Sequence, residues 1–87
     1  MKRAGRRRPY TEREIGQLRC VRCGALGVFQ WNACADGNLW RPICLECDVA
    51  LNLLVLTWLG DPDAEAKVAE YARKKRAGVK VESFLTP

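Results

Sequence analysis

Five cysteines lie between residues 20 and 47, and four of them form two C-x-x-C pairs, Cys20 with Cys23 and Cys44 with Cys47. Two thiolates separated by two residues can bind one metal ion from a tight turn, and two such turns complete a tetrahedral site. The chain has no histidine, so sulfur alone would hold the ion. Four protein ligands leave no position for water or substrate. We therefore predict one structural Zn²⁺ ion.

Two alternatives to zinc follow from the same residues. Iron also accepts a tetrahedral four-sulfur site, and the four cysteines could instead be buried thiols or disulfides. The opening "MKRAGRRRPY" is basic and lacks the apolar region of a secretory signal, and no apolar run approaches the roughly 18 residues that span a bilayer. We therefore expect a cytoplasmic protein with no membrane partner, and a reducing cytoplasm favours metal over disulfides.

Cys34 is the fifth cysteine and belongs to neither pair. We expect a buried free thiol beside a hairpin turn, because free cysteines are among the most buried residues. A substitute metal ligand and a redox-sensitive thiol are the alternatives for this residue.

The segments around the first pair predict a short helix and a hairpin. Thr11 and Glu14 form a capping-box pattern that begins a helix over about residues 12–18. Asp36 and Gly37 are a strong signal for a two-residue hairpin turn. That turn predicts the cross-strand pairs Cys34–Leu39, Ala33–Trp40 and Asn32–Arg41.

This register would give the hairpin an apolar face and a polar face. The apolar face should belong to the core, although its two tryptophans would stack on bases if that face were open. Pro42 lacks a backbone donor, which places its strand at a sheet edge. The two sets are Phe29, Trp31, Ala33 and Trp40 on the apolar face, and Gln30, Asn32 and Arg41 on the polar face.

The second half of the chain predicts two helices. Residues 48–59 are apolar on nearly every side, so we expect a helix that is buried on more than one side, with a homodimer through this helix as a further possibility. Asp61 as N-cap and Pro62 begin another helix that ends near Arg76, before Gly78. Residues 79–84 alternate in polarity and could add a short strand.

The length of the chain and the distribution of its charges limit how its domains can be organised. The 87 residues predict one small domain over residues 10–87, preceded by a basic flexible arm over residues 1–9. Residues 1–23 carry eight basic and two acidic side chains, residues 24–66 one basic and six acidic, and residues 67–87 six basic and two acidic. Because both ends are basic, a polyanion would bind there.

The stretch "DGNLWRPICLECDVALNLL", followed by "GDPDAEAKVAEYARK", resembles the recombination endonuclease VII group of HNH nucleases, which are common in phages and prophages. The likeness covers about residues 20–76. It includes two C-x-x-C pairs around a hairpin, a leucine-rich helix and a Gly-Asp step into the next helix. The resemblance implies a small α+β zinc-binding domain of treble-clef type, in which a zinc knuckle, a β-hairpin and a helix are accompanied by flanking helices.

The sequence departs from that group where the chemistry should be. In the family, a His-x-Asp-His-like cluster before the hairpin turn binds a divalent ion and activates water. Here the matching stretch is "FQWNACA", with Trp31 where the Asp should be and Asn32 or Cys34 where the His should be. Asp48 replaces the Asn that usually follows the last Cys. Trp31 cannot bind magnesium and Asn32 cannot accept a proton, so the nuclease chemistry is expected to be lost.

Basic side chains are the candidates for nucleic-acid binding, because Lys and Arg contacts to phosphates release counterions. They lie in the arm, in the second hairpin strand and at the end of the last helix. A solubilising tail and compensation of the helix dipole are the alternative roles. The candidates are Lys2, Arg3, Arg6, Arg7, Arg8, Arg41, Arg73, Lys74, Lys75 and Arg76.

Three functional hypotheses follow. The leading one is a phage-encoded regulatory protein that binds DNA or RNA in the bacterial cytoplasm and is not an enzyme. The second is a zinc-stabilised interaction module that docks on a host enzyme. The third is a residual nuclease that uses Asp36, Glu46 or Asp48 as metal ligands.

Overall fold

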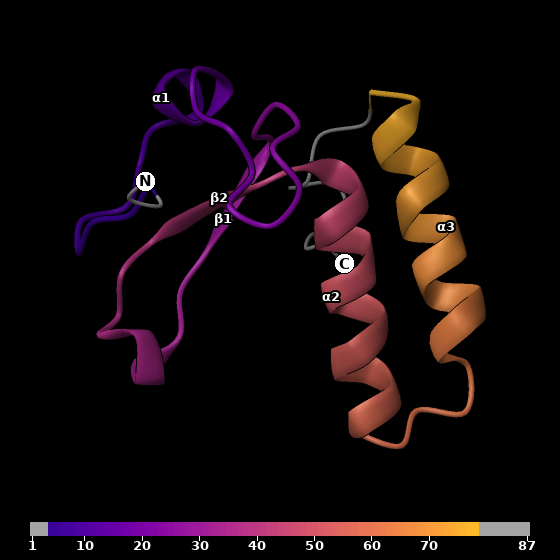
Figure 1. Ribbon diagram of the computed structural model, residues 1–87. Coiled ribbons are helices and arrows are strands. Elements are labelled where there is room, and N and C mark those ends of the chain that lie inside the picture. The colour runs from indigo at the N-terminus through magenta and orange to yellow at the C-terminus, as the bar shows by residue number, and fades with distance from the viewer. Residues whose placement is uncertain (1–3, 79–87) are drawn as a thin grey trace. The chain divides into compact units, whose positions relative to one another are not determined.

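The computed structural model describes residues 4–78. The chain is a small α+β protein that divides into two compact units, Met1–Asp48 and Val49–Pro87 (Figure 1). Its elements in order are α1 (Glu12–Gly16), β1 (Phe29–Trp31), the 3₁₀ turn η1 (Cys34–Asp36), β2 (Arg41–Ile43), α2 (Leu45–Trp58) and α3 (Ala64–Arg76). No helix within residues 4–78 is long and apolar enough to cross a bilayer.

The capping box at the start of α1 is confirmed. The Thr11 hydroxyl accepts a hydrogen bond from the Glu14 backbone N–H at 3.2 Å, and the Glu14 carboxylate accepts one from the Thr11 N–H at 2.9 Å. The helix buries Ile15 and ends at Gly16, slightly earlier than the sequence predicts.

The predicted hairpin register is wrong by one residue. Trp31 lies opposite Arg41, and Phe29 lies opposite Ile43. The two strands are joined by η1 and a left-handed pair, Gly37 at φ 76° and Asn38 at φ 60°, in place of a two-residue turn.

The connection between the strands accounts for the difference in register. The Ala33 carbonyl accepts hydrogen bonds from the Asp36 N–H at 3.1 Å and the Asn38 N–H at 3.0 Å, so the turn is longer than the predicted two residues. Trp40 pairs with Arg6 instead of Ala33, donating to the Arg6 carbonyl at 2.6 Å and accepting from the Arg6 N–H at 3.2 Å. Residues directly opposite in an antiparallel pair share a face, so Arg41 lies on the face of Trp31 and not on that of Gln30.

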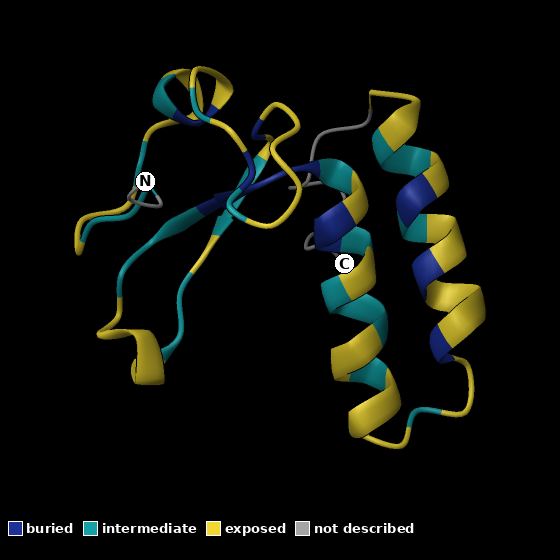
Figure 2. Ribbon diagram, viewed as in Figure 1, coloured by how far each residue is buried: buried dark blue, intermediate teal, exposed yellow. Residues whose placement is uncertain are grey.

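Trp31 is 46 % exposed, so its predicted place in the core is wrong, whereas Phe29 and Trp40 are half-buried. Pro42 is fully buried, and within residues 4–78 the sheet has two strands, so β2 lies at an edge. The fully buried hydrophobic residues of the first unit are Ile15, Pro42, Ile43, Cys20, Cys44 and Cys47 (Figure 2). Thiols therefore make up half of this core.

The second unit has a smaller core. α3 buries Ala64, Val68 and Ala72, which lie four residues apart on one face. α2 begins three residues before the predicted start at Asp48 and fully buries only Cys47 and Asp48, so the prediction of a helix buried on more than one side is wrong.

The start of α3 also differs from the prediction. The N-cap residue is Asp63 and not Asp61. The Asp61 carboxylate instead accepts hydrogen bonds from the Asp63 N–H at 2.8 Å and from the Lys67 ammonium at 2.7 Å. The end of the helix agrees with the prediction, because Gly78 has a left-handed φ of 83°. The strand predicted over residues 79–84 lies outside the described residues.

Candidate metal centre

The first cysteine pair lies on a tight loop that follows α1. The Gly24 N–H donates to the Cys20 carbonyl at 2.9 Å, and the Cys20 N–H donates to the Ala25 carbonyl at 2.7 Å. Gly24 has a φ of 84°, a left-handed conformation that glycine adopts without a steric cost. The loop therefore turns Cys20 and Cys23 toward a common point.

The second pair lies where β2 passes into α2. Cys44 follows the strand directly, and Cys47 belongs to the first turn of the helix, from which its N–H donates to the Cys44 Sγ at 3.4 Å. A backbone bond from the Val21 N–H to the Pro42 carbonyl, at 3.0 Å, joins the first loop to the end of β2. This bond brings the two pairs together.

The four sulfurs have the spacing of a metal site. The Sγ atoms of Cys20, Cys23, Cys44 and Cys47 all lie within 4.8 Å of one another, and those of Cys23 and Cys44 are 3.4 Å apart. A zinc ion with bonds of about 2.3 Å would require sulfurs roughly 3.8 Å apart. A disulfide needs about 2.05 Å, and all five cysteines are free thiols. The cluster therefore fits a tetrahedral ion such as zinc, and not a pair of disulfides.

The pKa values of two of the four thiols, Cys20 and Cys47, are shifted in opposite directions. Burial raises the pKa of the Cys20 thiol, but hydrogen bonds from backbone groups of Cys23, Cys44 and Arg22 outweigh it and lower the pKa to about 6. Burial and the neighbouring sulfurs raise the pKa of Cys47 to about 12. Four thiolates at this spacing would repel one another, and a bound divalent ion supplies the compensating charge.

Backbone donors also orient the sulfurs. The Arg22 N–H donates to the Cys20 Sγ at 3.4 Å, as the Cys47 N–H does to the Cys44 Sγ. Hydrogen bonds of this kind hold metal ligands in place and tune their basicity. Cys23 is the only exposed member of the four. With four sulfur ligands, the ion would have no open position for substrate, which suits a structural role.

Cys34 lies apart from this cluster, at the first position of η1. It is exposed, so the expectation of a buried thiol is wrong. The cluster of four within 4.8 Å does not include it.

The predicted nucleic-acid residues of the first unit fall into two groups, apart from Lys2 and Arg3, which lie outside the described residues. Arg6 and Arg41 make internal ion pairs, Arg6 with Glu14 at 2.8 Å and Arg41 with Asp36 at 2.6 Å. Arg6 also lies 4.2 Å from the centroid of the Tyr10 ring. Arg7 and Arg8 are exposed.

The basic end of α3 is partly engaged with its own helix. Arg73 donates twice to Glu70, at 3.1 and 2.7 Å, and the Lys74 ammonium lies 3.6 Å from the same carboxylate. Lys75 is half-buried and Arg76 is exposed. These four side chains lie in the last turn of the helix, where cations complement the helix dipole.

Sequence reasoning missed three exposed arginines of the first unit, Arg13, Arg19 and Arg22. Arg19 and Arg22 flank Cys20, and Arg19 pairs with Leu26 through an isolated β-bridge. Within residues 4–78, none of the three side chains takes part in an ion pair. The sequence contained a signal for two of them, because Arg19 and Arg22 each directly precede a cysteine of the first pair, in "LRCVRC".

The carboxylates considered for a residual nuclease lie in different surroundings. Asp36 is held by Arg41, Glu46 is exposed on α2, and Asp48 is buried in the first turn of that helix. Within residues 4–78 they form no three-ligand group of their own.

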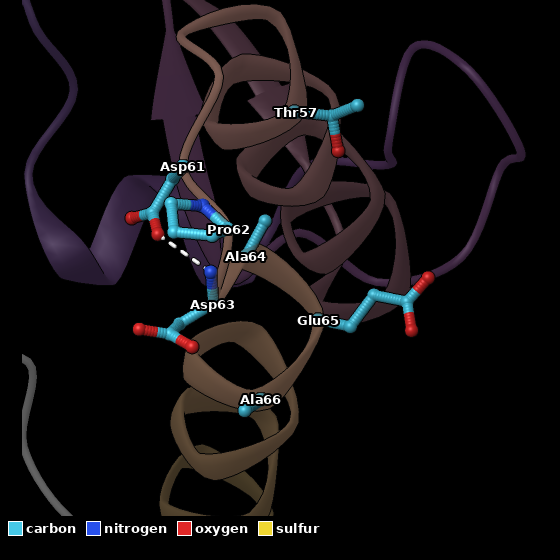
Figure 3. A pocket seen from close by; sticks show the side chains of 7 residues that line it. All are labelled: Thr57, Asp61, Pro62, Asp63, Ala64, Glu65 and Ala66. Carbon is cyan, nitrogen blue, oxygen red and sulfur yellow. Dashed lines mark hydrogen bonds between the residues drawn. The ribbon is translucent and has the colours of Figure 1, made fainter.

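A further concavity of about 450 Å³ lies at the start of α3, lined by Thr57 and residues 61–66 (Figure 3). Its three carboxylates are Asp61, Asp63 and Glu65, and Figure 3 shows the Asp63 N–H donating to Asp61. Among the described residues, the lining of this concavity therefore contains carboxylates but no basic side chain.

No protein-family profile matches the chain, and neither curated proteins nor solved structures show a significant match to it.

Proposed function

We propose that this chain is a zinc-stabilised nucleic-acid-binding protein. In this proposal the four-cysteine centre is structural, and the basic surface that binds phosphates lies on the first unit. The observation that carries it is the position of Arg19 and Arg22, which are exposed on the loop of the first cysteine pair and, within residues 4–78, are in no ion pair.

A metal-ordered loop is a suitable support for phosphate contacts. Arg19 directly precedes Cys20 and Arg22 directly precedes Cys23, so a bound ion would fix their backbone positions before a ligand arrives. Preorganised contacts lose less conformational entropy on binding than contacts from a disordered tail. Arg7, Arg8 and Arg13 are the other exposed arginines of this unit.

The charge balance of the first unit supports the same proposal. Residues 1–48 contain nine basic and five acidic side chains. Two of the acids, Glu14 and Asp36, are paired with Arg6 and Arg41. A zinc tetrathiolate would subtract about two charges, which still leaves this unit positive.

A salt series tests the proposal. Fluorescence anisotropy of the zinc-loaded protein with a labelled oligonucleotide should show binding that weakens steeply with salt, because counterions are released. The double variant Arg19→Gln/Arg22→Gln should weaken binding and reduce the salt slope by about 2. Lys67→Gln is the matched control, because Lys67 is already paired with Asp61. Absence of binding at low salt, or an unchanged slope in the double variant, would sink the proposal.

The remaining features of the proposal depend on the resemblance of the sequence to the recombination endonuclease VII group. They are the treble-clef arrangement, the phage origin, the bacterial cytoplasm, a regulatory role and the loss of nuclease chemistry. The absence of histidine and the closed four-sulfur centre support that loss. Incubation of supercoiled plasmid with the protein and Mg²⁺ or Mn²⁺ checks it, and nicking that disappears in an Asp48→Asn variant would reverse it.

The second candidate function is a protein-interaction module, and one observation favours it. Trp58 is 83 % exposed and Leu54 is 65 % exposed on α2. A host enzyme captured from nuclease-treated lysate by the parent chain, and not by Trp58→Gln, would support this function over nucleic-acid binding.

A further inference from the structure

Much of the C-terminal half of α2 is coloured as exposed in Figure 2, and several of its exposed residues are large and apolar. Trp58 is 83 % exposed, Leu54 is 65 % exposed and Val55 is 44 % exposed, and Leu59, just beyond the helix, is 64 % exposed. Contiguous exposed apolar patches are uncommon on soluble monomers and mark interaction surfaces. These residues all belong to the second unit.

The exposed residues form one stripe. Leu51, Leu54, Val55 and Trp58 follow the i, i+3, i+4, i+7 spacing that places side chains on a single helix face. Leu51, which is half-buried, is the first member. We define these four residues as the α2 stripe.

A second, mostly apolar set lies on the opposite side of α2. Val49, Leu53 and Leu56, together with the polar Asn52, have the same spacing, and at 100° per residue they lie about 160° away from the α2 stripe. All four are half-buried. The core of the second unit is otherwise small, because α3 contributes only Ala64, Val68 and Ala72 as buried residues. Burial of the α2 stripe would therefore add apolar burial, and hence stability, to this unit.

We propose that the α2 stripe is the interface of a homodimer in which two α2 helices pack antiparallel about a two-fold axis. The spacing of the stripe positions is symmetric about the midpoint between Leu54 and Val55. An antiparallel pair therefore places each Trp58 against the partner's Leu51 and each Leu54 against the partner's Val55, large side chains against smaller ones. A surface that is complementary to itself is what an isologous interface requires.

Charge and area agree with a second copy as the occupant. Residues 49–59 contain no charged side chain, so neither a polyanion nor a charged peptide finds a counter-charge there. A buried Trp contributes roughly 200 Å². With the two leucines and the valine, each copy would bury on the order of 500 Å², and the pair about 1,000 Å², which is the size of a weak, concentration-dependent dimer.

Sedimentation velocity of the zinc-loaded full chain over a concentration series tests the dimer. The parent chain should dimerise, and Leu54→Glu should weaken the dimer at least roughly tenfold, because a charge would then lie in the apolar contact. Ala69→Glu, which adds the same charge to an exposed position of α3, should leave it unchanged. A parent chain that stays monomeric throughout would overturn the proposal, and so would a Leu54→Glu chain that dimerises normally.

The antiparallel register has its own test, which does not depend on how well one variant dimerises. When Leu54→Glu and Val55→Lys chains are mixed, the Glu of one should face the Lys of the other. We expect a heterodimer that forms more readily than either homodimer. Absence of that preference overturns the register. A chain ending at Gly78 that dimerises when the full chain does not would show that residues 79–87 cover the α2 stripe, and would also overturn the proposal. Neither result depends on nucleic-acid binding.

Discussion

The guanidinium of Arg41 contacts both carboxylate oxygens of Asp36, through Nε at 2.6 Å and Nη2 at 2.8 Å. This pair joins the first residue of β2 to the last residue of η1, and so closes the loop between the strands. The remaining Nη1 donates to the Ala4 carbonyl at 3.2 Å. One side chain therefore connects the loop, the strand and the N-terminal segment.

Replacing Arg41 should destabilise the fold more than replacing an arginine in a more exposed ion pair. Arg41→Lys keeps the charge but loses the two-pronged contact with Asp36, because an ammonium group cannot match both carboxylate oxygens. Arg73→Lys is the control, since Arg73 makes a similar two-pronged contact with Glu70 but its side chain is 66 % exposed, against 19 % for Arg41. Thermal melts of the zinc-loaded variants should show a lower midpoint for Arg41→Lys and little change for Arg73→Lys. Equal midpoints would mean that the Asp36 contact adds no stability.

Local signals predicted the fold well, and the errors lie where distant segments meet. The capping box of Thr11 and Glu14 depends on four consecutive residues, and the structure has it as predicted. The register depends on how residues 29–31 meet residues 41–43 and on the connection between them, in which the Ala33 carbonyl accepts from the Asp36 and Asn38 N–H groups. A strong turn signal at Asp36 and Gly37 could not report the length of that connection.

The same distinction applies to the candidate site. The spacing of the two C-x-x-C pairs sufficed to predict that Cys20, Cys23, Cys44 and Cys47 meet. The sequence could not predict which arginines form ion pairs, because the pairing of Arg41 with Asp36 depends on the shape of the loop between the strands. The sequence also could not predict the exposure of individual side chains. Cys34 and Trp58 are apolar residue types, yet both are exposed.

Removal of a single metal ligand should abolish the fold of the first unit. Cys44→Ser leaves three thiols, and three of the six fully buried hydrophobic residues of this unit are ligand cysteines. Structural zinc contributes about 10–16 kcal/mol of apparent binding free energy in small domains, which is more than such a domain has to spare. We expect loss of the bound metal, by elemental analysis, together with loss of the cooperative thermal transition. Cys34→Ser should retain both, because Cys34 is exposed and outside the cluster; a Cys34→Ser chain without metal would show that the ligand set is different.

Gly27 should not tolerate alanine. A Cβ atom at this buried position would lie 2.7 Å from the Ile15 carbonyl oxygen and 3.1 Å from that of Leu18. Both contacts are to backbone, so the clash cannot be relieved by a side-chain rotation, and we expect a loss of about 1–3 kcal/mol. Gly16→Ala is the matched control, because a Cβ there meets nothing within 4 Å and alanine favours the helix by up to about 1 kcal/mol. Chemical denaturation at saturating zinc should move the two midpoints in opposite directions, and a destabilised Gly16→Ala would refute the packing argument.

Acid should weaken the start of α1 through Glu14. The Thr11 backbone N–H and then the Arg6 guanidinium, at 2.8 Å, lower the pKa of the Glu14 carboxyl to about 2, from an ordinary value of 4.5. A carboxyl whose pKa is depressed on folding stabilises the folded state at every pH above its unfolded value, and this stabilisation is lost as the pH falls from about 4.5 toward 2.

Two substitutions test this role of Glu14. Arg6→Gln should raise the pKa of Glu14 in a carboxyl-resolved NMR titration, because it removes the guanidinium contact and leaves the hydrogen bond from the Thr11 N–H. Glu14→Gln should lower the thermal midpoint at pH 7 more than Glu12→Gln, an exposed neighbour in the same turn. Equal effects of the two substitutions, or a Glu14 pKa that Arg6→Gln leaves in place, would contradict this account of the helix start.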